Sequence, residues 1–197
     1  MACVCRRSLA TDVARLIRHA DCPPVPWKNG AGTTRELWAL RDAGGVLVRI
    51  SIAEITGAQP FSVFPGTDRI IAQLGGPPMV LTIDGTAHPL SPLTPLPFRG
   101  EAKTSCALNG PGIARDLNLM TRRGAYRPAM RWIEAGAGAE VEVGEAGAVT
   151  ALLALDPVGV TGAVRAAMTA GDLIVTEGRI GVTPDRNAAF VLLEARP

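Results

Sequence analysis

The sequence predicts an all-β protein, because short apolar or alternating segments recur along its length with turn residues between them. The chain of 197 residues holds 22 glycines and 16 prolines, and these are spread widely rather than gathered in one region. Asp84-Gly85 has the composition of a tight hairpin turn, and residues 42–45 (Asp-Ala-Gly-Gly) have that of a second one. Strands at this spacing are typical of an antiparallel barrel or sandwich.

The first half of the chain contains five expected strands. Each is a short run bounded by Gly, Pro or Asp, and they cover residues 33–40, 46–54, 69–74, 79–83 and 87–90. Residues 74–78 (Leu-Gly-Gly-Pro-Pro) separate two of them, since proline has no N–H for strand pairing. Residues 13–19 would fit a helix or a strand, and the alternation of Val13, Arg15 and Ile17 favours a strand.

The second half continues this pattern, with expected strands over residues 104–108, 114–120, 130–134, 140–143, 148–155, 172–177 and 188–193. Residues 79–90 and 170–178 each resemble the hairpin part of a small jelly roll, and Gly171-Asp172-Leu173 resembles the turn that opens the later strands of cupin barrels. We therefore expect a small jelly roll present twice, as two fused β-barrels with a boundary between residues 123 and 138. Its expected parts are an N-terminal extension (1–14), a first barrel with the ligand pocket (15–125), and a second, smaller barrel (126–197) that exchanges a strand with the N-terminal segment.

The composition argues against nucleic acid and membranes as partners. The net charge is +2 with scattered basic residues, whereas nucleic-acid-binding proteins gather basic residues on one face. No apolar run approaches the ~18 residues that a membrane-spanning helix needs. Cys3, Cys5, Cys22 and Cys106 have no Cys-x-x-Cys spacing, so we expect reduced thiols in a cytoplasmic protein.

Residues 26–36 (Pro-Trp-Lys-Asn-Gly-Ala-Gly-Thr-Thr-Arg-Glu) place many hydrogen-bonding side chains around a Gly-x-Gly turn. Gly30 and Gly32 allow a positive φ or a close approach of the backbone to a ligand. The polar side chains are of the types that orient a small anionic or amide-bearing molecule. A structural turn would need the glycines but not these side chains, so we expect a binding loop.

Patterns for catalysis and metal binding are weak. His19 and His88 are the two histidines and have no His-x-His spacing, so a histidine-based metal site is not expected. Cys106 lies in an apolar strand, the usual setting of an inert buried thiol. General acid–base chemistry remains open for three carboxylates, Glu36, Asp68 and Asp116.

Polar and apolar residues alternate on three of the expected strands, which gives each strand one polar face. The polar faces carry Arg49 and Ser51; Asp116, Asn118 and Met120; and Thr34, Glu36 and Trp38. Such faces form either the solvated outside of the sheet or a polar lumen. Ser, Asn and Thr beside single Arg residues are unusual for an outer face, and they fit a lumen that holds a small ligand.

Residues 59–69 form a second loop of interest. Phe61 and Phe64 would anchor this loop to the core, and Pro65-Gly66 would turn it. Asp68 and Arg69 are then either a surface ion pair or the rim of the pocket.

Residues 26–36, 49–51, 60–69 and 116–124, taken in this order, resemble the HutD/Ves family of bacterial cupin-like proteins. The resemblance runs from about residue 16 to residue 123, more than half of the chain. One position departs from the family pattern, because Ala31 stands where the family has a glycine. The resemblance implies an RmlC-like cupin jelly roll present twice, as a bicupin of two fused β-barrels, without the usual metal ligands. It also implies a link either to histidine utilisation or, in the Ves branch, to environmental stress.

The resemblance also implies a ligand site. The motif residues carried over to it are Lys28, Asn29, Thr34, Arg35, Glu36, Arg49, Ser51, Ser62, Asp68, Arg69, Asp116, Asn118 and Arg122. Among these, Arg49 is the expected carboxylate-binding fork, since it lies mid-strand among apolar neighbours. Ser51, Thr34 and Asn118 would bind an amide or formyl group, and Glu36 or Asp116 would hold the arginine. Trp27, Phe61 and Phe64 are expected to be core anchors.

Together with the composition, the resemblance implies a cytoplasmic protein that binds a small carboxylate-bearing metabolite, such as a formylglutamate- or formiminoglutamate-like compound, without a metal or other cofactor. Such binding would regulate or limit histidine utilisation. The alternatives are a Ves-like stress-response protein and a metal-free cupin enzyme that acts as an isomerase or hydrolase. No catalytic residue is assigned, and binding is favoured over catalysis. Homodimerisation through a sheet face is compatible with each alternative.

Overall fold

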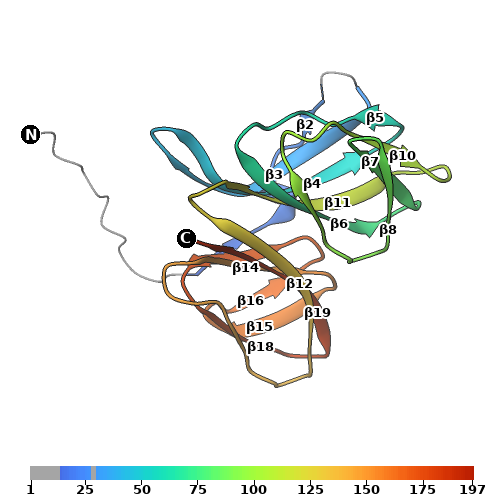
Figure 1. Cartoon of the computed structure of the whole chain (residues 1–197). Coiled ribbons are helices and arrows are strands. Elements are labelled where there is room, and N and C mark those ends of the chain that lie inside the picture. The colour runs from blue at the N-terminus through green and yellow to red at the C-terminus, as the bar shows by residue number, and fades with distance from the viewer. Residues whose placement is uncertain (1–13, 28–29) are drawn as a thin grey trace, which may run out of the picture.

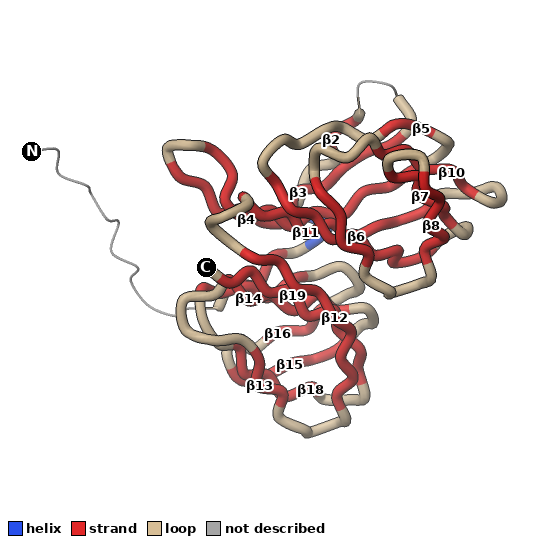
Figure 2. Tube along the Cα trace, in the orientation of Figure 1, coloured by secondary structure: helices blue, strands red, loops and turns tan. Residues whose placement is uncertain are grey.

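The computed structural model describes residues 14–27 and 30–197, and these form nineteen β-strands and one short 3-10 helix, η1 (His19–Asp21). The strands make four sheets stacked face to face, so the molecule consists of two sandwiches joined back to back (Figure 1). Figure 2 shows that strand makes up most of both sandwiches and that loops connect the strand ends. The expectation of an all-β protein is confirmed. Within the described ranges, no helix has the length and hydropathy needed to cross a membrane.

The first sandwich is built from one continuous stretch of the chain. Its larger sheet contains, in spatial order, β2 (Val25–Pro26), β3 (Gly32–Asp42), β4 (Gly45–Ile55), β11 (Ala114–Arg122), β6 (Thr67–Gly75) and β9 (Leu96–Arg99). The sheet that faces it contains β5 (Gln59–Pro60), β10 (Thr104–Leu108), β7 (Met79–Ile83) and β8 (Thr86–Leu90).

The second sandwich contains the rest of the chain and one strand from the N-terminal segment. Its larger sheet contains, in spatial order, β1 (Arg15–Ile17), β17 (Leu173–Glu177), β14 (Val149–Ala154), β19 (Ala188–Arg196) and β12 (Arg127–Ala135). The sheet that faces it contains β13 (Val141–Val143), β18 (Ile180–Pro184), β15 (Val158–Gly162) and β16 (Ala166–Met168).

Three apolar clusters separate the four sheets. The central cluster joins the six-stranded sheet to the five-stranded sheet, with side chains such as Ile50 and Leu117 on one side and Leu153 and Val191 on the other. A second cluster fills the second sandwich. The third cluster lies inside the first sandwich and is smaller, with six buried residues against thirteen in the second cluster. The first sandwich therefore has room for a cavity between its sheets.

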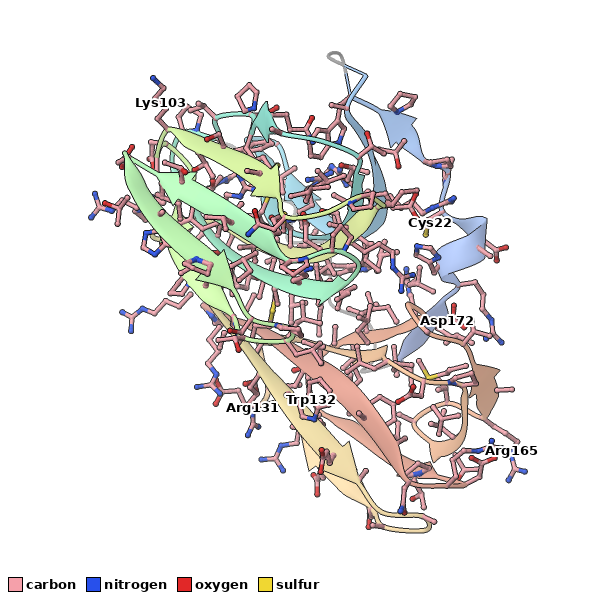
Figure 3. The ribbon with its side chains drawn as sticks, turned by 90° about the vertical axis from the view of Figure 1, so that its right-hand side faces the viewer. Cys22, Lys103, Arg131, Trp132, Arg165 and Asp172 are labelled. Atoms are coloured by element: carbon pink, nitrogen blue, oxygen red, sulfur yellow. The ribbon has the colours of Figure 1, made fainter. Side chains whose placement is uncertain are left out.

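The N-terminal segment ties the two sandwiches together. β1 pairs with β17, and the chain then passes through η1 to β2 in the first sandwich. Buried Asp172 accepts hydrogen bonds from Arg18 Nη1 (2.8 Å) and from the His19 backbone N–H (2.9 Å). Gly171 has φ +93°, and a Cβ there would lie 3.2 Å from the His19 ring. Asp172 thus anchors the segment where it crosses between the sandwiches (Figure 3).

Each expected strand overlaps an observed one, but six observed strands were not expected. These are β2, β5, β9, β15, β16 and β18, which are short or contain Gly or Pro. Their pairing depends on neighbouring strands rather than on their own pattern. The expected boundary at residues 125 and 126 falls in the turn between β11 and β12. The two sheets of each sandwich do not close into a continuous barrel, since each sheet keeps two edge strands.

A β-bulge in β3 changes one expected face. The register against β4 shifts so that Glu36 pairs with Ser51 while Trp38 pairs with Ile50, which leaves Leu37 as the additional residue. Leu37 and Trp38 therefore both pack against the central cluster. The expectation that Trp38 shares a face with Glu36 is wrong, because strict alternation is lost at the bulge.

Candidate ligand-binding cavity of the first sandwich

A cavity of about 580 Å³ opens inside the first sandwich. Its floor is formed by β3, β4, β6 and β11, and its walls come from β2, β5 and the loop that follows β5. The cavity lies on the face of the six-stranded sheet that is turned away from the central cluster, because the residues between the lining residues belong to that cluster.

Strand register places the floor residues in three adjacent rows across the sheet. The first row is Arg49, Met120 and Arg69; the second is Glu36, Ser51 and Asn118; the third is Thr34, Ala53 and Asp116. Polar residues from four strands thus converge on one small area, which is how a cavity fixes the orientation of a small ligand.

Arg69 is the most deeply buried cation of the cavity, with 5% of its surface exposed. Its guanidinium lies over three phenylalanine rings, at 4.8 Å from the centroid of Phe98, 5.3 Å from that of Phe64 and 5.6 Å from that of Phe61. Burial lowers the pKa of Arg69 to about 10, so the side chain is still cationic at neutral pH. Its Nη2 donates to Asn118 Oδ1 at 2.8 Å, but its Nε has no hydrogen-bond partner among the described residues.

Asp116 is fully buried in the cavity floor and is linked to Arg69 through Asn118. The Asn118 amide nitrogen donates to Asp116 Oδ1, while Oδ2 has no partner within the described part of the chain. Burial raises the pKa of Asp116 to about 7, although the Arg69 charge and the Asn118 hydrogen bond both act to lower it. Among the described residues, two buried polar atoms beside the cavity are therefore unpaired, Arg69 Nε–H and Asp116 Oδ2.

The second cation of the cavity, Arg49, is held by Glu36. Arg49 Nε donates to one oxygen of Glu36 at 2.9 Å, and Arg41 Nη2 donates to the other at 2.6 Å. Burial alone would raise the pKa of Glu36, but these two hydrogen bonds outweigh it and hold that pKa below its usual value. Arg49 Nη1 also contacts Met120 Sδ at 3.7 Å. Arg49 is thus fixed in place by a carboxylate that stays ionised.

The Gly-x-Gly loop sets one wall of the cavity. Trp27 Nε1 donates to Thr34 Oγ1 at 2.7 Å, and its ring meets the Phe61 ring edge to face at 5.9 Å. Gly32 is needed for close packing, because a Cβ there would lie 2.6 Å from a backbone oxygen and 3.2 Å from the Trp27 ring. Gly30 has φ +72°, whereas Ala31 does not have a positive φ. The Ala31 substitution therefore leaves the turn in an ordinary conformation.

Eight of the thirteen residues expected at the ligand site line the cavity: Thr34, Glu36, Arg49, Ser51, Ser62, Arg69, Asp116 and Asn118. Lys28 and Asn29 lie outside the described residues. The aromatic residues expected to be core anchors also line the cavity, and Phe98 joins them around Arg69. The sequence did not point to Phe98, because its strand was not expected.

The remaining three expected residues lie elsewhere. Arg35 is on the other side of β3, where its Nη1 donates to a backbone carbonyl of the N-terminal segment. Arg122 pairs with Asp42 at 2.8 Å, and Asp68 pairs with Arg123 at 2.8 Å, both away from the cavity. These ion pairs are partly exposed and fasten loops.

The described residues of the first sandwich contain no metal-ligand cluster and no activated cysteine. Within the described ranges, no group of three His, Cys, Asp or Glu side chains is placed to hold a metal ion. Burial raises the pKa of the Cys106 thiol, so this cysteine is not an activated nucleophile. A shallower depression of about 680 Å³ lies on the second sandwich, and its charged residues, Arg165 and Asp185, are exposed. Among these two hollows, only the first has buried charged groups.

Comparisons with known sequences agree with these motifs. The HutD family model matches residues 19–192. An uncharacterised 21.2 kDa protein from the hutC 3′ region of Pseudomonas putida is 42% identical over 125 residues, which is 61% of this chain and 64% of the relative. Protein Ves of Citrobacter koseri is 38% identical over 110 residues, which is 53% of this chain and 56% of the relative. The matched region thus spans less than two thirds of either relative's length.

Two solved structures share the whole architecture. A conserved protein of unknown function, PA5104 from Pseudomonas aeruginosa, has a TM-score of 0.81 and 29% identity, covering 93% of this chain and 99% of that one. HutD from Pseudomonas fluorescens, solved in a formate condition, has a TM-score of 0.74 and 29% identity, covering 93% and 100%. With the family model matching most of its length, this chain belongs to the HutD family, which has a cupin-like all-β fold.

Proposed function

We propose that the protein binds a small acidic metabolite in the cavity of the first sandwich, without a metal, and thereby regulates or limits histidine utilisation in the cytoplasm. The proposed ligand is a formylglutamate- or formiminoglutamate-like compound. The two sandwiches would then be the two cupin-like units of a bicupin, of which only the first has a polar lumen.

The buried Arg69 is the observation that carries this proposal. A cation with 5% exposure and an unpaired Nε is costly unless an acceptor completes its hydrogen bonds. A ligand carboxylate would supply that acceptor, and Asn118 and the three phenylalanine rings already fix the guanidinium in position. Ser51 and Thr34, in the neighbouring rows, are available for an amide or formyl group.

The relatives support the pathway assignment. One is encoded in the hutC 3′ region of its organism, and the solved HutD structure comes from a formate condition, formate being the smallest carboxylate. The match to protein Ves favours a second candidate, a stress-response role in which the cavity has no metabolic ligand.

Calorimetric titration of the metal-stripped protein tests the proposal. N-formyl-L-glutamate and N-formimino-L-glutamate should bind saturably, and glutamate and succinate should bind more weakly or not at all. Since a hydrogen bond to a charged group contributes about 1.5–3 kcal/mol, Arg69→Met should weaken binding about 10- to 100-fold. Its thermal midpoint should be measured alongside binding, because the replacement removes a buried charge but also the donor to Asn118 Oδ1.

Arg122→Met is the matched control, because Arg122 lies outside the cavity and pairs with exposed Asp42. It should bind the ligand as the unaltered protein does. Absence of saturable binding by every acid in the panel would favour the Ves-like role. Full affinity in the Arg69→Met variant would remove Arg69 from the site.

A further inference from the structure

Asp116 occupies an unusual position in the cavity. It is fully buried, and its two oxygens differ in their surroundings. The Asn118 amide nitrogen donates to Oδ1. Oδ2 is buried and has no hydrogen-bond partner among the described residues. An ionised carboxylate in this place would leave a charged, unpaired oxygen out of contact with water, which is strongly unfavourable.

The cation nearest in the network does not remove this problem. Arg69 reaches Asp116 only through Asn118, whose amide accepts from Arg69 and donates to Asp116. Arg69 itself keeps an unpaired Nε–H. A proton on Asp116 Oδ2 would turn the unpaired oxygen into a donor, since a protonated carboxyl carries one O–H. The wall would then offer two donors, Arg69 Nε–H and Asp116 Oδ2–H, and a carboxylate has two oxygens to accept them.

We propose that Asp116 determines the specificity of the cavity for acidic ligands: it binds the ligand carboxylate as a neutral carboxyl that donates from Oδ2 beside Arg69, so that an Asp116 that is ionised before binding takes up one proton from solution as the ligand enters. This inference rests on the proposed binding of an acidic metabolite. It adds that a neutral amide in place of the carboxylate binds poorly, because an amide NH₂ would leave one of the two donors unpaired.

The other charged groups around Asp116 do not change this conclusion. On β4 and β3, Arg49 and Glu36 are paired with each other, and Glu36 is ionised. On β6, Arg69 is cationic, and its charge acts to lower the pKa of Asp116, but burial outweighs this effect. On β10, Cys106 has a raised pKa and stays a neutral thiol. Neither histidine lines the cavity, and Lys28 is outside the described residues.

The proposal predicts a pH dependence of binding with a definite sign. The pKa of Asp116 is about 7 in the free protein, so the fraction with a neutral carboxyl falls as the pH rises through 7. Above pH 7, a ligand that needs this neutral form can bind only when Asp116 takes up a proton. The dissociation constant of the ligand should therefore rise about tenfold per pH unit above that value. N-formyl-L-glutamate suits this test, because its carboxylates and its formamide do not titrate between pH 6 and pH 9.

Titration calorimetry with N-formyl-L-glutamate measures both quantities. The dissociation constant should be about tenfold higher at pH 8 than at pH 6. At pH 8, titrations in buffers of different ionisation enthalpy should show close to one proton taken up per ligand, and at pH 6 close to none. These measurements use the unaltered protein, so they do not depend on the folding of a variant.

Asp116→Asn removes the titrating group while keeping an oxygen that accepts from Asn118 and a donor in place of Oδ2–H. We expect this variant to bind without proton uptake and with the same affinity at pH 6 and at pH 8. The matched control is Asp42→Asn, the same replacement at an exposed carboxylate outside the cavity. It should keep the full pH dependence.

The outcomes separate this inference from the proposed function. Binding that is independent of pH, or that releases a proton, overturns the role of Asp116 and leaves the acidic-ligand function intact. Such a result would mean that Asp116 is ionised and accepts an N–H from the ligand. No binding of N-formyl-L-glutamate at any pH overturns the proposed function and this inference with it.

Discussion

The two sandwiches have the same arrangement of sheets, but the interior of the first is partly polar and the interior of the second is apolar. In each, a larger sheet packs against the central cluster with one face and faces a four-stranded sheet with the other. The interior of the second sandwich is filled by aliphatic side chains and by Phe190, which is fully buried. The interior of the first holds Arg69, Asp116 and Asn118 around a cavity. The architecture therefore does not determine whether an interior binds a ligand; the residues on one face of a few strands do.

The comparison can be followed along single strands. In β11, the residues facing the interior are Asp116, Asn118 and Met120, while Leu117 and Leu119 face the central cluster. In β19, both faces are apolar over most of the strand, which has the burial pattern of a core strand. In the first sandwich, polar groups replace apolar packing on the interior face of β11. In the second sandwich, the interior is an apolar core. Stability and binding should thus respond to mutation in different places.

The largest predicted loss of stability comes from a mutation in the packed interior of the second sandwich. Phe190→Ala should lower the free energy of unfolding by about 3–5 kcal/mol, because a fully buried aromatic ring leaves a cavity that the sheets cannot close. Urea unfolding monitored by circular dichroism measures this change. Wherever the variant is folded, its ligand affinity should equal that of the unaltered protein.

Phe61→Ala in the first interior is the matched comparison. Phe61 is half-buried and packs on Arg69, so its loss should cost less stability and should weaken ligand binding. Equal losses of stability in the two variants would show that the first interior is as tightly packed as the second.

The next prediction concerns how the stability of the protein depends on pH through Asp116 in the first interior. The pKa of Asp116 is about 7 in the folded chain, against an ordinary value of 3.8. Between these values the folded state binds the extra proton, so the stability of the unaltered protein should fall as the pH rises from about 4 through 7. Relative to Asp116→Asn, the loss should reach the order of 4 kcal/mol, at about 1.4 kcal/mol per pKa unit.

Urea unfolding of both proteins at pH 5 and pH 8 samples about 3 kcal/mol of this difference, because about two of the pKa units fall between these pH values. The lowered pKa of His19 acts with the opposite sign near pH 6, but both proteins share it and it cancels in the comparison. Parallel stability curves for the two proteins would mean that Asp116 is not held neutral in the fold. No similar pH effect is expected for Asp42→Asn, because hydrogen bonds from Arg122 lower the pKa of Asp42 and keep it ionised over this range.

Sequence reasoning succeeded where a strand carries its own pattern. Residues 79–83 and 104–108 match β7 and β10 residue for residue, since each is apolar and Asp84-Gly85 fixes the hairpin with φ values of +48° and +85°. It missed strands such as β15 and β18, where glycines and a proline interrupt the pattern and pairing with neighbours decides the structure. Local pattern is absent there, so only the assembled sheet defines the strand.

The candidate site shows the same limit. Arg49 and Ser51 could be placed on one face by alternation alone. The sequence left Arg69 as half of a surface pair or as a rim residue. In the structure Asp68 pairs outward, and Arg69 is buried beneath aromatic rings from the loop after β5 and from β9. A bulge that moves Trp38 off the cavity face is equally invisible in the sequence. Contacts between distant segments decide both features.

The smallest predicted change in stability concerns a buried polar group in the interior of the second sandwich. Thr150 is fully buried on β14, opposite Thr176, and its Oγ1 has no hydrogen-bond partner among the described residues. A buried hydroxyl without a partner costs about 1–3 kcal/mol, and valine has nearly the same shape. Thr150→Val should therefore raise the free energy of unfolding by about 1 kcal/mol and leave ligand binding unchanged. Thr161→Val, at an exposed threonine of the same sandwich, should change stability by less than about 0.5 kcal/mol. A clear loss of stability in Thr150→Val would instead mean that this hydroxyl is satisfied and that the second interior, like the first, uses its buried polar groups.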